Sequence, residues 1–167
     1  VVGRFIGDHA LAAVGTPMCL TGLDEGILSA LEHEGKTVRR MPLSEMLWFL
    51  WRDNGKKADR TLLNEVSAAM GEGSTFSHTP DRLFGVAEAH LDGFAGANGR
   101  YRYAKTLEMG EHAAAVLTLS PRYENTEMVL SLRGMAQNCP APLFELSLDG
   151  DWDEAGWSRL RSFLYYC

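Results

Sequence analysis

Ala113-Ala114-Ala115-Val116-Leu117-Thr118-Leu119 is the stretch of sequence that decides the fold. It is a continuous apolar run with one hydroxyl and no charge, a composition typical of a strand that is covered on both faces. Such a strand belongs to the interior of a parallel sheet, because the crossover helices that join parallel strands pack on both sides of it. The run therefore predicts an α/β fold with this strand at the centre.

Before the central run, the hydrophobic pattern alternates between strand and helix. Ile27, Leu28 and Leu31 follow helical spacing and are closed by a glycine stop signal. The predicted elements are, in order, a strand over 1–7, a loop with glycine and proline over 8–20, a helix that ends at Gly35, a strand over 36–41 and a helix over 44–51.

The rest of the chain continues the alternation. The predicted elements are a helix over 80–91, a loop over 93–99, a helix over 101–112, the central strand, a helix over 124–139, a strand over 143–148 and a helix over 153–166. Together they predict a Rossmann-like, doubly wound parallel sheet of about four strands with helices on both faces.

Residues 54–80 differ from this pattern. Leu62, Leu63, Val66 and Met70 form a helical stripe, and a polar loop follows up to Thr79. We interpret this section as a helical insertion or lid.

Composition and charge narrow the class of protein. The chain has 167 residues, of which 46% are hydrophobic and 23% charged, which suits a single domain with one core. Its net charge of −6 and its scattered lysines and arginines argue against nucleic acid and against anionic membranes as partners. The sequence has no membrane-spanning run and no leader pattern, so we expect a cytoplasmic protein. Because it begins at Val1 inside an apolar run, we interpret residues 1–167 as one domain excised from a longer polypeptide.

The three cysteines, Cys19, Cys139 and Cys167, form no CxxC pair, and their odd number favours reduced thiols. The five histidines show no zinc-ligand spacing. The Walker GxxxxGK[ST] pattern is absent, and no GxGxxG follows a predicted strand. We therefore expect no cofactor in the isolated domain.

A doubly wound sheet binds its ligand in the crevice outside the carboxyl ends of the strands. Arginines in the connecting loops suit bidentate contact with a phosphate or carboxylate, so we expect an anionic group there, such as a phosphate or the pyrophosphate of coenzyme A. The candidate binding residues are Arg4 and Asp8 after the first strand, Arg122, Tyr123, Glu124 and Asn125 after the central strand, Asn98 and Arg100 at the rim, and Asp149 at the end of the fourth strand.

Structural roles compete with each of these assignments. Asn125 caps a helix equally well, and Glu124 suits a helix N-terminus. Asp149 suits a turn beside a glycine, and the arginines near Gly99 suit a solvent-facing loop. Cys19 fits a buried structural cysteine as well as a reactive thiolate.

Most of the chain resembles one known family. The runs NGRYRYAKTLEMGEHAAAVLTLSPRYENTEMVLSLRG (98–134) and PLFELSLDGDWDEAGWSRLRSFL (142–164) are similar to 2-hydroxyacyl-CoA dehydratases. The opening VVGRFIG (1–7) and GLDEGILSALEHEGKTVRRMPLSE (22–45) resemble the strand–loop–helix–strand start of that family. In particular, the chain resembles the dehydratase-subunit-like segments of acyl-CoA dehydratase activase-related proteins from anaerobic bacteria.

The resemblance implies an accessory or ligand-binding domain that works with other domains or subunits of a dehydratase and activase system. In that system an ATP-dependent activator passes an electron to a [4Fe-4S] cluster of the dehydratase. The family's cluster-ligand cysteine follows the central strand, whereas this chain has Ser120-Pro121-Arg122 there. The alternative is a genuine dehydratase subunit domain that contributes to the cluster, with Cys19 as a metal ligand, and to the 2-hydroxyacyl-CoA site.

Overall fold

The computed structural model describes residues 10–15, 25–53, 61, 65, 68–69, 80–91, 96–121, 135–148 and 152–167. A four-stranded parallel sheet forms its centre, in the order β2-β1-β3-β4. The strands are β1 (Leu11–Gly15), β2 (Val38–Arg40), β3 (Ala115–Pro121) and β4 (Leu143–Leu148). The predicted α/β class and the Rossmann-like parallel sheet are confirmed.

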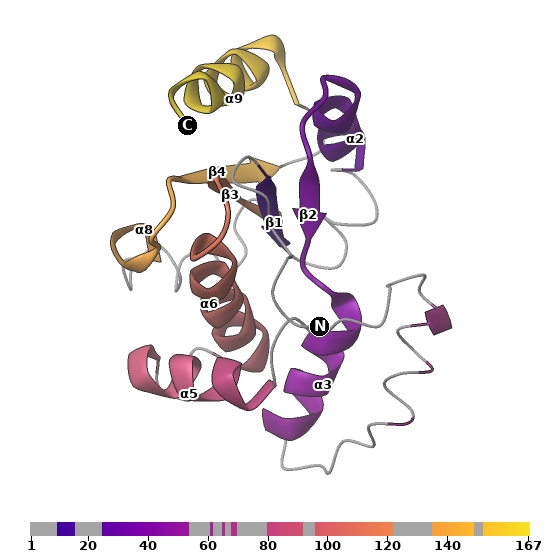
Figure 1. The fold of residues 1–167 in the computed structure, drawn as a ribbon, viewed down its shortest axis with the longest axis vertical. Coiled ribbons are helices and arrows are strands. Elements are labelled where there is room, and N and C mark those ends of the chain that lie inside the picture. Colours follow the sequence, from indigo (N-terminus) through magenta and orange to yellow (C-terminus); the bar gives the residue numbers. More distant parts are fainter. Residues whose placement is uncertain are drawn as a thin grey trace.

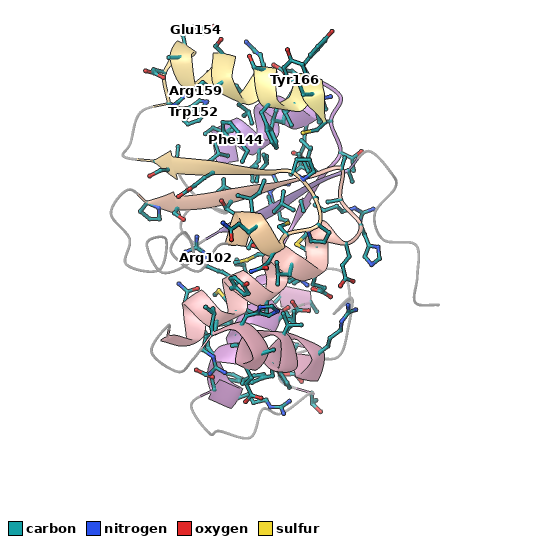
Figure 2. All side chains as sticks on the ribbon, turned by 90° about the vertical axis from the view of Figure 1, so that its left-hand side faces the viewer. Arg102, Phe144, Trp152, Glu154, Arg159 and Tyr166 are labelled. Atoms are coloured by element: carbon teal, nitrogen blue, oxygen red, sulfur yellow. The ribbon has the colours of Figure 1, made fainter. Side chains whose placement is uncertain are left out.

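Helices cover both faces of the sheet, with α2 and α9 on one side and α3, α5, α6 and α8 on the other (Figures 1 and 2). Their bounds are α2 (Glu25–His33), α3 (Leu43–Asp53), α5 (Pro80–His90), α6 (Gly96–Gly110), α8 (Met135–Asn138) and α9 (Glu154–Tyr166). The separation of α2 from α3, α5, α6 and α8 follows from right-handed crossovers, because the connection from β1 to β2 and the later connections run in opposite directions across the sheet. None of these helices is long and apolar enough to cross a membrane.

The central strand lies where the sequence predicts it, two residues further along the chain. All of β3 except Pro121 is buried, and β3 pairs with β1 on one side and β4 on the other. Its side chains alternate between the two helical layers. Ser120 contacts α6, whereas the β4 partner of Leu117, Phe144, packs against Phe163 of α9 with ring centroids 5.0 Å apart. Both faces are covered, which explains the apolar run.

The neighbour of β3 corrects a prediction. The sequence suggests a strand through Phe5 and Ile6, which lie outside the described residues, and a loop over 8–20. The strand that pairs with β3 is instead Leu11–Gly15, so the loop prediction is wrong for this stretch. The alanines of Leu11–Gly15 give only a weak strand signal in the sequence, because alanine has low strand propensity. Ala12 and Ala13 are fully buried, and tertiary packing overrides that propensity.

Gly15 allows β1 and β3 to approach closely at their carboxyl ends. A Cβ atom on Gly15 would lie 2.7 Å from the carbonyl oxygen of Leu119 and 2.9 Å from its Cβ. Both distances are shorter than a carbon side chain tolerates, and one of the two contacts is rigid backbone. Glycine is therefore required here for space.

Local sequence signals at glycine, proline and aspartate residues predict several helix ends correctly. Gly35, with φ of 83°, follows α2, and Pro80 begins α5. Asp153 caps α9, its carboxylate accepting a bond of 2.7 Å from the Gly156 amide. The predicted loop over 93–99 is wrong at its end, because α6 already begins at Gly96. Glycine at a helix start is tolerated, so the residue type alone does not place the boundary.

Two predicted segments fall mainly outside the described residues. The helical insertion over 54–80 is one, and most of the helix over 124–139 is the other, of which only α8 is described.

Val116 tests the central position of β3. Val116→Asp places a carboxylate in a fully buried apolar site, and we expect it to abolish cooperative folding. The cost of several kcal/mol is comparable with the whole stability of a small domain. Thermal unfolding followed by circular dichroism measures this. Ser147→Asp, on the exposed part of β4, is the control and should melt like the wild type; a cooperatively melting Val116→Asp variant would contradict the assignment.

Gly15 and Gly85 make a matched pair for the close approach of β1 and β3. Gly15→Ala should lower the free energy of unfolding by about 1–3 kcal/mol, because the added methyl pushes against the Leu119 carbonyl. Gly85→Ala adds the same methyl to the exposed side of α5, where nothing lies within 4 Å, and should raise it by about 0.5–1 kcal/mol. Urea denaturation of both variants decides the matter: equal effects would mean that Gly15 is not a packing requirement.

Candidate functional site

The strand order reverses between β1 and β3, so a ligand crevice is expected outside their carboxyl ends. Gly15 and Pro121 are the last residues of these two strands. The segments that follow them, 16–24 and 122–134, lie outside the described residues. The predicted site residues outside the described part of the chain are Arg4, Asp8, Arg122, Tyr123, Glu124, Asn125 and Asp149, together with the metal-ligand candidate Cys19.

Arg102 reaches the carboxyl end of the central strand from α6. Its NH2 group donates to the Ser120 hydroxyl at 2.5 Å and to the Leu119 carbonyl at 3.3 Å. Only 1% of Arg102 is exposed. Figure 2 shows this side chain on the α6 side of the sheet. A guanidinium group is therefore buried beside the point where the strand order reverses.

Two hydroxyls continue this polar layer between α6 and β3. Thr106 lies one helical turn after Arg102, and Thr118 lies on the same face of β3 as Ser120. Because α6 runs antiparallel to β3, the two threonines occupy neighbouring levels. Both hydroxyl oxygens are buried and have no hydrogen-bond partner. Such groups are costly in a core, which makes this layer a candidate for contact with a polar ligand.

Asn98 and Arg100 belong to the first turns of α6. Arg100 forms an ion pair with Asp53 at the end of α3, and its guanidinium lies 5.9 Å from the ring centroid of Phe84. The Asn98 side-chain oxygen is buried without a hydrogen-bond partner. The structure thus brings Arg102 to the strand end, while Arg100 joins α3 to α6. The sequence predicts a ligand contact in this segment, but of its two arginines only Arg100 is among the predicted binding residues.

Charged side chains also meet between α3 and α6. The Lys105 ammonium lies 2.8 Å from Oε1 of Glu45 and 2.6 Å from Oε2 of Glu108. The Tyr101 hydroxyl donates to the same Glu45 oxygen at 2.9 Å and lies 3.2 Å from the Pro42 carbonyl. The four residues whose side chains meet here are each at most 5% exposed. We call Glu45, Tyr101, Lys105 and Glu108 the α3–α6 clasp.

Burial and charge act against each other in the clasp. Burial raises the pKa of Glu45, and the charge of Lys105 lowers it by less, so the net direction is upward. Burial alone would lower the pKa of Lys105, but Glu45 and Glu108 together reverse this and raise it. Lys105 is therefore an ammonium ion at neutral pH, and its positive charge is what makes two buried carboxylates tolerable.

The clasp was not selected from the sequence, although one signal was present. Arg102, Lys105 and Glu108 follow one another at intervals of three residues along α6, so three charged side chains occupy neighbouring positions on one side of the helix. Glu45 lies far from Lys105 in the sequence, and nothing local connects them.

The described residues do not fit an iron–sulfur cluster. Cys139 lies near Gly110, where a Cβ atom would be 2.6 Å from its sulfur, and Cys167 ends the chain after α9. Burial raises the pKa of the Cys139 thiol, which disfavours the thiolate that a metal needs. Within the described part of the chain, no three His, Cys, Asp or Glu side chains gather to hold a metal ion.

No family model, no curated protein and no solved structure matches the chain.

Lys105→Met tests the energetic role of the clasp. Removing the ammonium leaves Glu45 and Glu108 without the cation that they share, and we expect a loss of about 3–5 kcal/mol in the free energy of unfolding. Arg82→Met is the control, because it breaks an exposed pair with Glu111 and should cost less than about 1 kcal/mol. Chemical denaturation at neutral pH compares them. Equal losses in both variants would show that the clasp contributes no more than a surface pair.

Proposed function

We propose that this chain is an accessory, ligand-binding domain of an acyl-CoA dehydratase activase-related protein. Its ligand is an acyl-CoA or a nucleotide, bound through an anionic group at the carboxyl ends of β1 and β3. The domain itself performs no turnover in this proposal, and it works by contact with other domains or subunits of the dehydratase system.

The observation that carries the proposal is the position of Arg102. Its guanidinium is buried against Leu119 and Ser120, at the end of the sheet where doubly wound folds bind ligands. Burying a guanidinium is costly, and a core of this size gains more stability from an apolar side chain of equal volume. A positive charge retained at this place is well suited to an anionic ligand, because planar N–H donors match phosphate and carboxylate oxygens.

The geometry around Arg102 supports a ligand with both charged and polar parts. Thr118 and Thr106 offer buried hydroxyls in the layer beneath it. Gly15 brings β1 close to the Leu119 carbonyl that accepts from Arg102, so the two strand ends are held at a fixed spacing. A preorganised site of this kind loses little entropy on binding.

The assignment to a dehydratase system rests on the sequence resemblance over residues 1–7, 22–45, 98–134 and 142–164. The absence of the family's cysteine after the central strand favours an accessory role over a cluster-binding one.

Titration calorimetry against acetyl-CoA and ATP tests the proposal. We expect the wild type to bind at least one of them, and Arg102→Gln to weaken that binding by about 1.5–3 kcal/mol, the scale of a charge-assisted hydrogen bond. Ser120→Ala is the milder variant, because it removes a single partner of Arg102 and should weaken binding less. Thermal melting of both variants shows whether the fold persists. A wild type that binds neither ligand would refute the proposal.

Arg100→Ala is the matched arginine control. The sequence alone predicts that both Arg100→Ala and Arg122→Ala weaken binding. In the structure Arg100 is held by Asp53, so we expect its loss to lower stability and leave affinity nearly unchanged. An affinity loss for Arg100→Ala equal to that for Arg102→Gln would indicate that the ligand binds nearer the start of α6.

A further inference from the structure

Strand β4 forms one edge of the sheet and carries two exposed polar side chains, Glu145 and Ser147, which we call the β4 strip. They pair in register with Thr118 and Ser120 of β3, whose side chains face α6, so the β4 strip projects from the same face. Thr118 and Ser120 are at most 3% exposed. Helix α6 therefore covers β3 on this face and leaves the carboxyl half of β4 open.

The β4 strip begins where the apolar packing of β4 ends. Leu143, two residues before Glu145 on the same face, packs against Leu91 and Tyr103. Phe144 lies on the opposite face, toward α9 (Figure 2). Ser147 has a short side chain, so its exposure shows that the face itself is accessible at that point.

The β4 strip borders the proposed ligand site. Ser147 lies beside Ser120, the hydroxyl that accepts from Arg102. Glu145 lies beside Thr118, whose hydroxyl is buried without a hydrogen-bond partner. Strand geometry separates Glu145 from Ser120 by about 5 Å across the sheet and about 7 Å along it. This separation is comparable with the span from a phosphate to the ribose hydroxyls within one nucleotide.

The charge of Glu145 restricts what can bind beside it. A carboxylate accepts hydrogen bonds and repels anions, so Glu145 is unsuited to the anionic group that Arg102 attracts. It is suited to hydroxyl donors, as are the carboxylates that bind ribose hydroxyls in dinucleotide-binding folds. A ribose that carries a phosphate, as in coenzyme A, would place a negative charge against Glu145.

We propose that Glu145 is a specificity-determining residue that accepts hydrogen bonds from the ribose hydroxyls of a nucleotide whose phosphates lie at Arg102. The Thr118 hydroxyl supplies a second polar contact beside it. The ligand of the domain is then a nucleotide with free ribose hydroxyls, such as ATP, rather than a coenzyme A thioester. This inference rests on the proposed function, because it concerns the same site.

Titration calorimetry of Glu145→Ala against ATP and 2′,3′-dideoxy-ATP tests the contact from both sides. We expect the wild type to bind ATP about threefold to tenfold more tightly than the dideoxy ligand, the scale of a net hydrogen bond. Glu145→Ala should lose this preference, because its dissociation constant for ATP rises while that for dideoxy-ATP stays level or falls slightly as the repulsion is removed. Glu88→Ala removes an exposed carboxylate from α5 and is the matched control, which should keep the wild-type preference.

Thr118→Val tests the second contact, since it removes the hydroxyl and nearly keeps the shape of the side chain. The hydroxyl has no hydrogen-bond partner in the free domain, so we expect no fall in melting temperature. The preference for ATP over dideoxy-ATP should fall about twofold to threefold. A lower melting temperature with an unchanged preference would show that the hydroxyl serves the fold and would remove Thr118 from the site.

The outcomes separate this inference from the proposed function. If the wild type binds neither ATP nor acetyl-CoA, both are refuted. If it binds acetyl-CoA but not ATP, or if Glu145→Ala keeps the preference for ATP, the inference is overturned and the proposed function stands. An inward-facing charge on an edge strand also hinders pairing with another chain. A Glu145→Ala variant that self-associates in size-exclusion chromatography and keeps the preference would therefore show that Glu145 protects the sheet edge and contacts no ribose.

Discussion

Burial of charge on α6 is the constraint on which the rest of the structure depends. A buried cation must be paired with acceptors, and α6 carries two buried cations three residues apart, Arg102 and Lys105, whose acceptors lie on different elements. Arg102 finds them at the end of β3, and Lys105 finds them on α3 and one turn along its own helix. Two contacts in different directions fix both the rotation and the lengthwise position of α6. The placement of α3 and α5 follows, since Phe49 stacks on Phe84 with ring centroids 4.2 Å apart beside α6.

The parts of the fold that depend on local signals could be predicted from the sequence. The apolar run predicts β3, a run of alternating apolar and polar residues predicts β4, and Asp153 as a helix cap predicts the start of α9. β1 could not be predicted, because its alanines have low strand propensity and become a strand only between two neighbours. The start of α6 was missed for a related reason: Gly96 begins a helix that is stabilised by tertiary contacts rather than by its own first residues.

The candidate site was predicted less well than the fold, since a site depends on which way a helix faces. Residues two apart on a helix point to different sides, so Arg100 and Arg102 cannot be told apart until the packed face is known. The ion pair of Glu45 with Lys105 also cannot be predicted without the tertiary fold, because it joins α3 to α6, two separate helices in the connection between β2 and β3. Seven binding residues predicted from the sequence lie outside the described part of the chain and stay predictions, namely Arg4, Asp8, Arg122, Tyr123, Glu124, Asn125 and Asp149.

The pairing of β1 with β3 also has a consequence for how the chain reaches its folded state. Leu11 pairs with Ala115, about a hundred residues later, whereas β3 and β4 are joined by a much shorter connection. Closing the longer loop costs more entropy, and contacts between distant residues slow folding. Leu11 of β1 and Val38 of β2 are as near in sequence as Val116 of β3 and Leu143 of β4, so we expect each of these two pairs to form early and the β1–β3 pairing to form last. Gly15 sits at the seam that closes last, where a methyl group would hinder the entry of the strand as well as its final packing.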